Sequence, residues 1–280
     1  MHPTICVNKF AVLFEKPVFC MESLTTEGMK MEKSTCEQFK NYIKSYSGID
    51  GGNRKSRIWF CGIEYGGATE ELDGNRCAYT LAQVKGWDDD FKNQNVWKND
   101  RRKWTFNRTI AKIMATMIYG AKAANTKECW ETYYDKQLFA PCGNEFKLNL
   151  FPLAFRNTSE WVKSSCFQKK DQYYDFCRQD RFGLLRKLKS DLNPKIVICF
   201  GLCCKSDFEK AFGFSESLES HFCVAKNERR RYFHSVEGDS VLLVLPFPNR
   251  RFGLNSWEAV EKASELILDL GKLDRGDLHT

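Results

Sequence analysis

One carboxylate, Glu64, stands where an apolar run gives way to glycines, a setting that suits the activation of water or the stabilisation of positive charge. Residues 58–67 read Ile-Trp-Phe-Cys-Gly-Ile-Glu-Tyr-Gly-Gly. The apolar part predicts a buried strand, and the small residues after it let a ligand approach the backbone. Open α/β sheets bind ligands at the carboxyl ends of their strands, so we expect this acid in a binding site.

Three more apolar runs end in residues that suit such an edge. Residues 146–151 contain Asn149, whose amide offers both a donor and an acceptor. Residues 195–200 are followed by Gly201, and residues 241–245 are followed by Pro-Phe-Pro-Asn-Arg-Arg. One edge is therefore acidic and another basic, which favours a site that handles a polyanion.

The length and charge are those of one large domain that is compatible with nucleic acid. The chain has 280 residues, with 43 basic and 36 acidic side chains and a net charge of +7. Many enzymes share that balance, so the charge alone decides little. No apolar run approaches the roughly 20 residues that span a bilayer, and we expect no membrane partner.

The cysteine pattern predicts free thiols and no metal centre. There are 13 cysteines without a Cys-x-x-Cys pair, and the four histidines do not cluster with them. We therefore expect no metal, no iron–sulfur cluster and no other cofactor. Reduced thiols are typical of a cytoplasmic protein, and that is the localisation we expect.

Strand-like and helix-like segments alternate, which predicts an α/β fold of three layers with helices on both faces of a mostly parallel sheet. We expect residues 1–50 to form an N-terminal extension with a short helix, and residues 51–280 to form one domain with an insertion at about 68–103. Strands are expected at residues 57–63, 146–151, 195–200, 230–234 and 241–245. Helices are expected at residues 34–46, 104–124, 159–192 with a break near Gly183, 206–212 and 257–270, and a glycine-rich linker at 48–57.

The order of these strand ends resembles the uracil-DNA glycosylase superfamily. In that superfamily the first strand ends in Gly-x-Asp/Asn-Pro, the second in a base-reading asparagine, the third in glycine after a Pro-Lys start, and the last in His-Pro-Ser. The matching stretches here are residues 62–66, 147–152, 193–201 and 245–249. The resemblance covers about residues 57–270 and implies the fold of that superfamily.

The resemblance also implies base excision, in which a nucleotide is flipped from the duplex and its N-glycosidic bond is hydrolysed to leave an abasic site. Glu64 falls where the family places its water-positioning residue, and Asn149 falls where it places the base-reading asparagine. The residues alone leave alternatives open: a surface or helix-start acid for Glu64, and a strand-end turn residue for Asn149.

Three departures separate the chain from an ordinary uracil enzyme. Tyr65 replaces the motif proline, Gly66 replaces the tyrosine that blocks a 5-methyl group, and Phe247 replaces the motif histidine. An open wall at Gly66 favours a pyrimidine with a bulky group on carbon 5. One branch of the superfamily removes glucosylated hydroxymethylcytosine from phage DNA in antiviral defence, and this chain is similar to what we expect of that branch.

DNA with modified bases is the expected partner, and no obligatory protein partner is inferred. Basic and aromatic residues after the last motif suit phosphate contacts and a wedge in the gap left by a flipped base: Asn249, Arg250, Arg251 and Phe252. Lys205 and Ser206, at a predicted helix start, form a candidate anion site. An ordinary basic surface loop is the alternative.

The sequence leaves other functions open. The chain could be a non-catalytic DNA-binding or regulatory protein on the same fold, with Phe247 as the mark of lost chemistry, or a conventional uracil or mismatch repair glycosylase. An unrelated α/β hydrolase or nucleotide-binding enzyme lacks support, because no P-loop, Gly-x-Gly-x-x-Gly or Gly-x-Ser-x-Gly motif occurs. The acid at position 64, beside two glycines, favours an enzyme.

Overall fold

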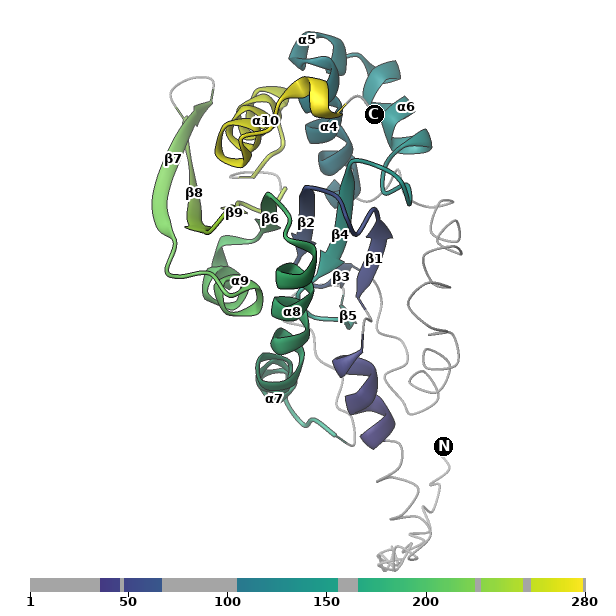
Figure 1. The fold of residues 1–280 in the computed structure, drawn as a ribbon, viewed down its shortest axis with the longest axis vertical. Helices are drawn as coiled ribbons and strands as arrows, with labels where there is room; N and C mark the ends of the chain where they lie inside the picture. Colours follow the sequence, from purple (N-terminus) through teal and green to yellow (C-terminus); the bar gives the residue numbers. More distant parts are fainter. Residues whose placement is uncertain are drawn as a thin grey trace, which may run out of the picture.

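The centre of the protein is a seven-stranded mixed sheet (Figure 1). The computed structural model describes residues 36–45, 48–66, 105–155, 166–224, 228–248 and 253–278. In spatial order the strands are β1 (Ile49–Gly52), β4 (Glu145–Asn149), β2 (Ile58–Gly62), β6 (Ile196–Phe200), β9 (Ser240–Leu245), β8 (Glu228–Glu237) and β7 (Leu218–Val224). The four central strands β4, β2, β6 and β9 are parallel, and the outer strands pair antiparallel.

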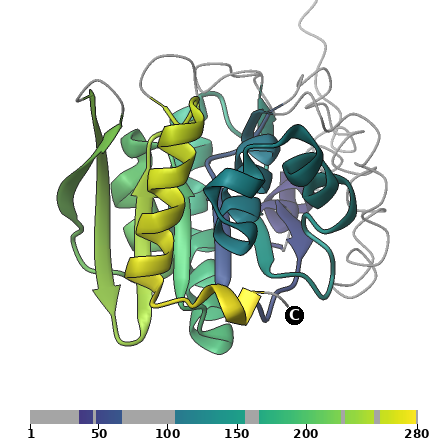
Figure 2. The ribbon, with the colours of Figure 1, turned by 90° about the horizontal axis from the view of Figure 1, so that it is seen from above.

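Helices cover both faces of the sheet (Figure 2). One face packs against α4 (Thr105–Tyr119), α6 (Lys127–Lys136) and α10 (Trp257–Gly271), with the short helices α5 (Ala121–Ala124) and η6 (Arg275–Leu278) nearby. The other face packs against α7 (Lys170–Phe176), the π-helical turn η3 (Cys177–Arg181), α8 (Phe182–Leu192), α9 (Lys205–Phe212) and a helix over residues 36–44. The 3-10 turn η4 (Leu202–Cys204) leads into α9.

The strands are apolar along their whole length because both of their faces are covered. In β2, Ile58 and Phe60 contribute to the core on the α4 side, whereas Trp59 and Cys61 contribute to the core on the α8 side. All five β2 residues are buried, as are those of β4, β6 and β9. The predicted α/β class with a parallel centre and helices on both faces is therefore confirmed.

The prediction of a glycine-rich linker at residues 48–57 is wrong, because part of this segment forms the edge strand β1. Gly51 and Gly52 adopt φ values of 127° and 93°, which favour glycine. A Cβ atom on Gly52 would collide with the carbonyl oxygen of Glu145 on the neighbouring strand. These glycines permit close pairing of the two backbones. Glycines are also typical of loops, which is why the sequence predicted a linker here.

Several helix and strand predictions needed correction. The helix expected at 104–124 ends at Tyr119, because Gly120 with φ 82° separates α4 from α5. The long helix expected at 159–192 is interrupted by the π-helical turn η3, which ends two residues before Gly183, where a break was expected nearby. Its described part begins at Lys170. The strand expected at 230–234 extends over all of β8, and both α6 and β7 were not predicted. The predicted N-terminal extension, apart from its short helix, and the insertion at 68–103 lie outside the described residues.

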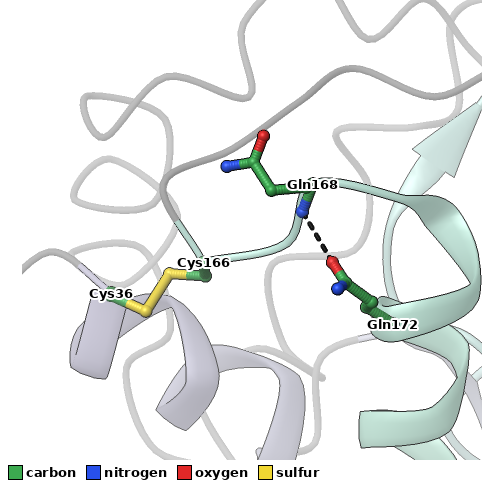
Figure 3. The surroundings of a disulfide bond; sticks show 4 residues. All are labelled: Cys36, Cys166, Gln168 and Gln172. Atoms are coloured by element: carbon green, nitrogen blue, oxygen red, sulfur yellow. Dashed lines mark hydrogen bonds between the residues drawn. A yellow bond between two sulfur atoms is a disulfide. The ribbon is translucent and has the colours of Figure 1, made fainter.

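A disulfide joins Cys36 to Cys166, whose Cα atoms lie 5.3 Å apart (Figure 3). It links the helix over residues 36–44 to the segment that leads into α7. The expectation of reduced thiols is therefore wrong for this pair, since spacing along the chain cannot reveal two cysteines that are 130 residues apart. Cys61, Cys177 and Cys199 are buried free thiols, as expected. Within the described residues, no helix is long and apolar enough to cross a membrane.

Candidate functional site

The four motif-bearing strands end at one edge of the sheet. Their parallel pairing sets Gly62 beside Asn149 and Phe200 beside Leu245 in register. The backbone N–H of Gly201 donates to the carbonyl oxygen of Leu245 at 2.9 Å, so the third and fourth strand ends are tied together. The residues that sequence reasoning placed at carboxyl strand ends therefore gather at a common edge.

Glu64, just past the end of β2, is enclosed by hydrogen-bond donors. Its side chain is only 6% exposed. The Nζ atom of Lys170 lies 3.2 Å from each of its two carboxylate oxygens. The hydroxyl of Tyr174 donates to Oε2, also at 3.2 Å. The alternative of a surface-loop acid at position 64 is thus wrong, because this carboxylate is buried and paired.

Both donors come from α7, where Lys170 and Tyr174 are one turn apart and share a face. The start of α7 is fixed by Gln172, whose Oε1 accepts the backbone N–H groups of Gln168 at 2.8 Å and Lys169 at 3.2 Å (Figure 3). Gln172 is therefore the residue that sets where the helix begins and so which residues face Glu64.

Aromatic rings surround this acid and its partners. The ammonium of Lys170 lies 3.7 Å from the ring centroid of Phe155, and Tyr174 packs on Phe151 with centroids 4.3 Å apart. Burial and the negative charge of Glu64 raise the pKa of Tyr174, so its hydroxyl remains protonated and available as a donor. The result is a carboxylate with one cationic and one neutral donor in an apolar surround.

The side chain of Asn149 is anchored to the backbone of Gly48 and lies against Gly62. Its side chain is buried, and its Nδ2 donates to the carbonyl oxygen of Gly48 at 3.3 Å. A Cβ on Gly62 would approach Asn149 Oδ1 to 2.5 Å and the ring of Phe106 to 3.4 Å. The glycine in the first motif therefore leaves room for the asparagine amide of the second.

Arg181, in the π-helical turn, supports the strand end that carries Asn149. Its side chain is fully buried and donates to the carbonyl oxygens of Asn149 at 3.3 Å and Leu150 at 3.1 Å. It also donates to the carbonyl oxygens of Ile43 and Ser45 at the end of the first described helix, at 3.1 and 2.8 Å. π-helical turns are frequent at functional sites, and this one directs a guanidinium into the support of the site.

Phe247 forms part of an aromatic wall with Phe106. Their ring centroids are 6.1 Å apart with an interplanar angle of 24°, and Phe247 is 41% exposed. Phe106 also meets Phe200 edge to face at 5.2 Å. Since Phe106 also lies close to Gly62, this wall adjoins the Asn149 amide.

Of the remaining predicted site residues, some lie in the described part of the structure and others do not. Tyr65 and Gly66 form the short strand β3 (Tyr65–Gly66), which runs parallel to β5 (Ala154–Phe155). Gly66 thus pairs with Phe155, the residue whose ring packs against Lys170. The candidate DNA contacts after the last motif lie outside the described residues: Asn249, Arg250, Arg251 and Phe252.

Lys205 and Ser206 begin α9 as predicted, but their setting argues against an anion site. The Nζ atom of Lys205 lies 3.3 Å from Glu209 and 3.6 Å from Glu216. Two carboxylates therefore already balance its charge, which weakens any phosphate contact. Ser206 is exposed next to it.

Sequence reasoning missed the residues that hold the site from behind. Lys170, Tyr174 and Arg181 all come from a segment that was predicted only as helix. The one available signal was the i, i+4 spacing of Lys170 and Tyr174, which many surface helices also show. Within the described residues, no cluster of three or more histidine, cysteine or acidic side chains could hold a metal ion.

Comparison with known proteins adds no family to this geometry. No protein-family model matches the chain, and no curated protein matches it either.

Proposed function

We propose that this protein is a DNA glycosylase, with a fold like that of the uracil-DNA glycosylase superfamily, that removes a pyrimidine bearing a bulky group on carbon 5. The observation that carries the proposal is the buried Glu64 carboxylate, held by two donors at the sheet edge where Asn149 also lies. Glucosylated hydroxymethylcytosine in phage DNA is the candidate base.

In this mechanism Glu64 orients a water molecule toward carbon 1′ of the flipped nucleotide. A carboxylate has about four lone-pair positions, so it can bind a water in addition to Lys170 and Tyr174. The water oxygen bonds to carbon 1′ as the bond from carbon 1′ to the base nitrogen breaks, and the departing base takes the electron pair of that bond. Glu64 accepts the proton that the water loses, and the base anion takes up a proton from solvent. The negative charge of Glu64 stabilises the positive charge that develops on the sugar.

The neighbouring residues suit recognition of the flipped base. Enzymes that flip bases read their edges by hydrogen bonds and stack them on aromatic or apolar side chains. Asn149 supplies the donor and the acceptor, and the Phe106–Phe247 wall beside it supplies the apolar surface. Gly66 adds no side chain to the short strand β3 that follows Glu64. Phe247 cannot donate a hydrogen bond to the departing base, which favours a base other than plain uracil.

The test is a panel of otherwise identical oligonucleotides, each carrying one cytosine, uracil, hydroxymethylcytosine or glucosylated hydroxymethylcytosine. Alkali-labile breaks at the bulky base, absent with Glu64→Gln, support the proposal. Breaks at uracil alone would favour a conventional repair glycosylase. Binding to the panel without any break would favour the non-catalytic alternative and contradict the enzyme.

A further inference from the structure

The ion pair between Lys170 and Glu64 is buried and joins two segments that are far apart in the sequence. Lys170 and Glu64 are 106 residues apart, and their side chains are 9% and 6% exposed. By contrast, Lys187 and Asp191 form an ion pair on α8 at 2.6 Å with side chains that are 72% and 54% exposed. Exposed pairs contribute little, whereas removing one partner of a buried pair leaves an uncompensated charge.

We propose that Lys170 is a positioning residue for the proposed reaction: its ammonium keeps the Glu64 carboxylate ionised and fixes the direction of its oxygens. This inference rests on the proposed function and assigns a role to a residue that the resemblance does not include. Tyr174 completes the arrangement as a neutral donor to Oε2. Together the two donors orient the carboxylate plane while leaving lone pairs for water.

Among the described residues near Glu64, the other titratable groups are neutral or bound to another acid, so the positive charge of Lys170 has the largest effect on its carboxylate. Tyr173 on α7 and Cys204 on η4 feel the charge of Glu64, but burial raises the pKa of each, so both stay neutral. Arg178 packs near the ring of Tyr174, yet its guanidinium is bound to Asp207 through Nε and Nη2 at 2.8 and 2.9 Å. Of the residues that the structure describes, Lys170 supplies the cation in contact with the carboxylate.

Loss of this cation should change the acid limb of the rate profile. A buried carboxylate without a cation has a raised pKa, because burial disfavours the charged form. Glu64 would then become protonated as the pH falls through a higher value, and activity would be lost over a range where the wild type still works. The change depends on pH, which a purely structural role for Lys170 does not predict.

The experiment measures single-turnover base release from pH 4.5 to 9 for the wild type, Lys170→Met and Lys170→Arg, with Lys187→Met as the matched control. We expect Lys170→Met to shift the acid limb up by at least about one unit, which is about a tenfold loss at the acid end relative to pH 8. Lys170→Arg and Lys187→Met should keep the wild-type limb. An unshifted limb, or an equal loss at every pH, overturns the role. Lys170→Gln serves the same test if Lys170→Met does not fold.

A second measurement separates this inference from the proposed function. Carbon-13 NMR of the glutamate side-chain carboxyls, with the Glu64 signal assigned through Glu64→Gln, follows its titration without any DNA. We expect a higher midpoint for Glu64 in Lys170→Met than in the wild type, and equal midpoints overturn the inference. If the midpoint moves but the wild type releases no base from any DNA of the panel, the proposed function fails while the electrostatic coupling stands.

Discussion

Two buried glutamates lie at opposite ends of the neighbouring parallel strands β4 and β2, and they differ in their hydrogen-bond partners. Glu145 begins β4 and is fully buried, and its oxygens accept from the Tyr133 hydroxyl at 2.6 Å and the Phe139 backbone N–H at 2.7 Å. Glu64 follows the end of β2 and is held by an ammonium as well as a phenol. One acid thus has neutral donors, and the other has a cation.

The partners decide the charge state of each acid. Burial raises the pKa of Glu145 to about 7, although its two hydrogen bonds oppose that rise. It is a structural acid that is protonated over part of the physiological range. Lys170 instead favours the ionised form of Glu64, which is the form that can orient water. A buried carboxylate is therefore a candidate catalyst only when its partners keep it charged and its surroundings admit substrate.

The largest expected effect separates the two acids by activity. Glu64→Gln should lower base release by about 10²–10⁴-fold, the usual loss when a general base is removed, while DNA binding persists. Glu145→Gln should leave the rate within a few-fold of the wild type, because Glu145 lies at the other end of the strands. Single-turnover assays on the bulky base, together with binding measurements, check both variants. Equal losses for the two variants would mean that Glu64 has no special role.

The second prediction concerns the stability that Glu145 contributes as a function of pH. Its folded pKa lies above the ordinary value of 4.5, so the folded state takes up a proton more readily than the unfolded state. The contribution to the free energy of unfolding is therefore present below about pH 4.5 and is lost as the pH rises through about 7. Over that range the loss is on the order of 3 kcal/mol.

Glu145→Gln should remove this dependence, because glutamine does not titrate and its amide can still accept from Phe139 and donate to Tyr133. Urea unfolding of wild type and variant at pH 5 and pH 8 measures it. The wild type should lose stability relative to the variant between these two values. A difference that is the same at both would refute the raised pKa.

How far the sequence predicts this molecule is clearest at these two sites. The strand ends that carry Glu64 and Asn149 were predictable, since apolar runs closed by glycine or proline mark buried strands and parallel strands share an edge. The partner of Glu64 was not, because Lys170 lies 106 residues away and neighbours Lys169, which looks identical in the sequence. The same holds for Arg181, whose partners are backbone carbonyls that carry no residue-specific signal.

The third prediction tests whether the absence of a side chain at Gly66 leaves space for a bulky group on the base. Gly66→Tyr should lower the specificity constant for the bulky base relative to a small one by at least about 10-fold, because even one methylene of mismatch in an apolar pocket is worth about 10–200-fold. General DNA affinity should change little. Gly183→Tyr, which adds the same side chain on the exposed part of α8 where nothing lies within 4 Å, is the matched control. Full release of the bulky base by folded Gly66→Tyr would remove the open-wall argument.

The smallest expected effect concerns the basic residues Arg250 and Arg251, which follow β9 in the sequence. Replacing Arg250 and Arg251 with alanine should weaken binding to all DNA sequences alike and flatten the salt dependence by about one unit of slope per lost phosphate contact. The control, Arg229→Ala with Arg231→Ala, removes the same charge from the exposed positions of β8. If both double variants show the same salt slope, Arg250 and Arg251 make no special contact with DNA.

The most direct measurement of the central claim is to identify the products. Wild-type protein is incubated with a duplex that carries glucosylated hydroxymethylcytosine at one position, and the free base and the DNA are both quantified by mass spectrometry. We predict that the free modified base and an abasic strand appear in equal amounts, and that neither appears with Glu64→Gln. Intact modified DNA recovered from wild-type protein that binds it would contradict the assignment of Glu64 as the catalytic carboxylate of a glycosylase acting on this base.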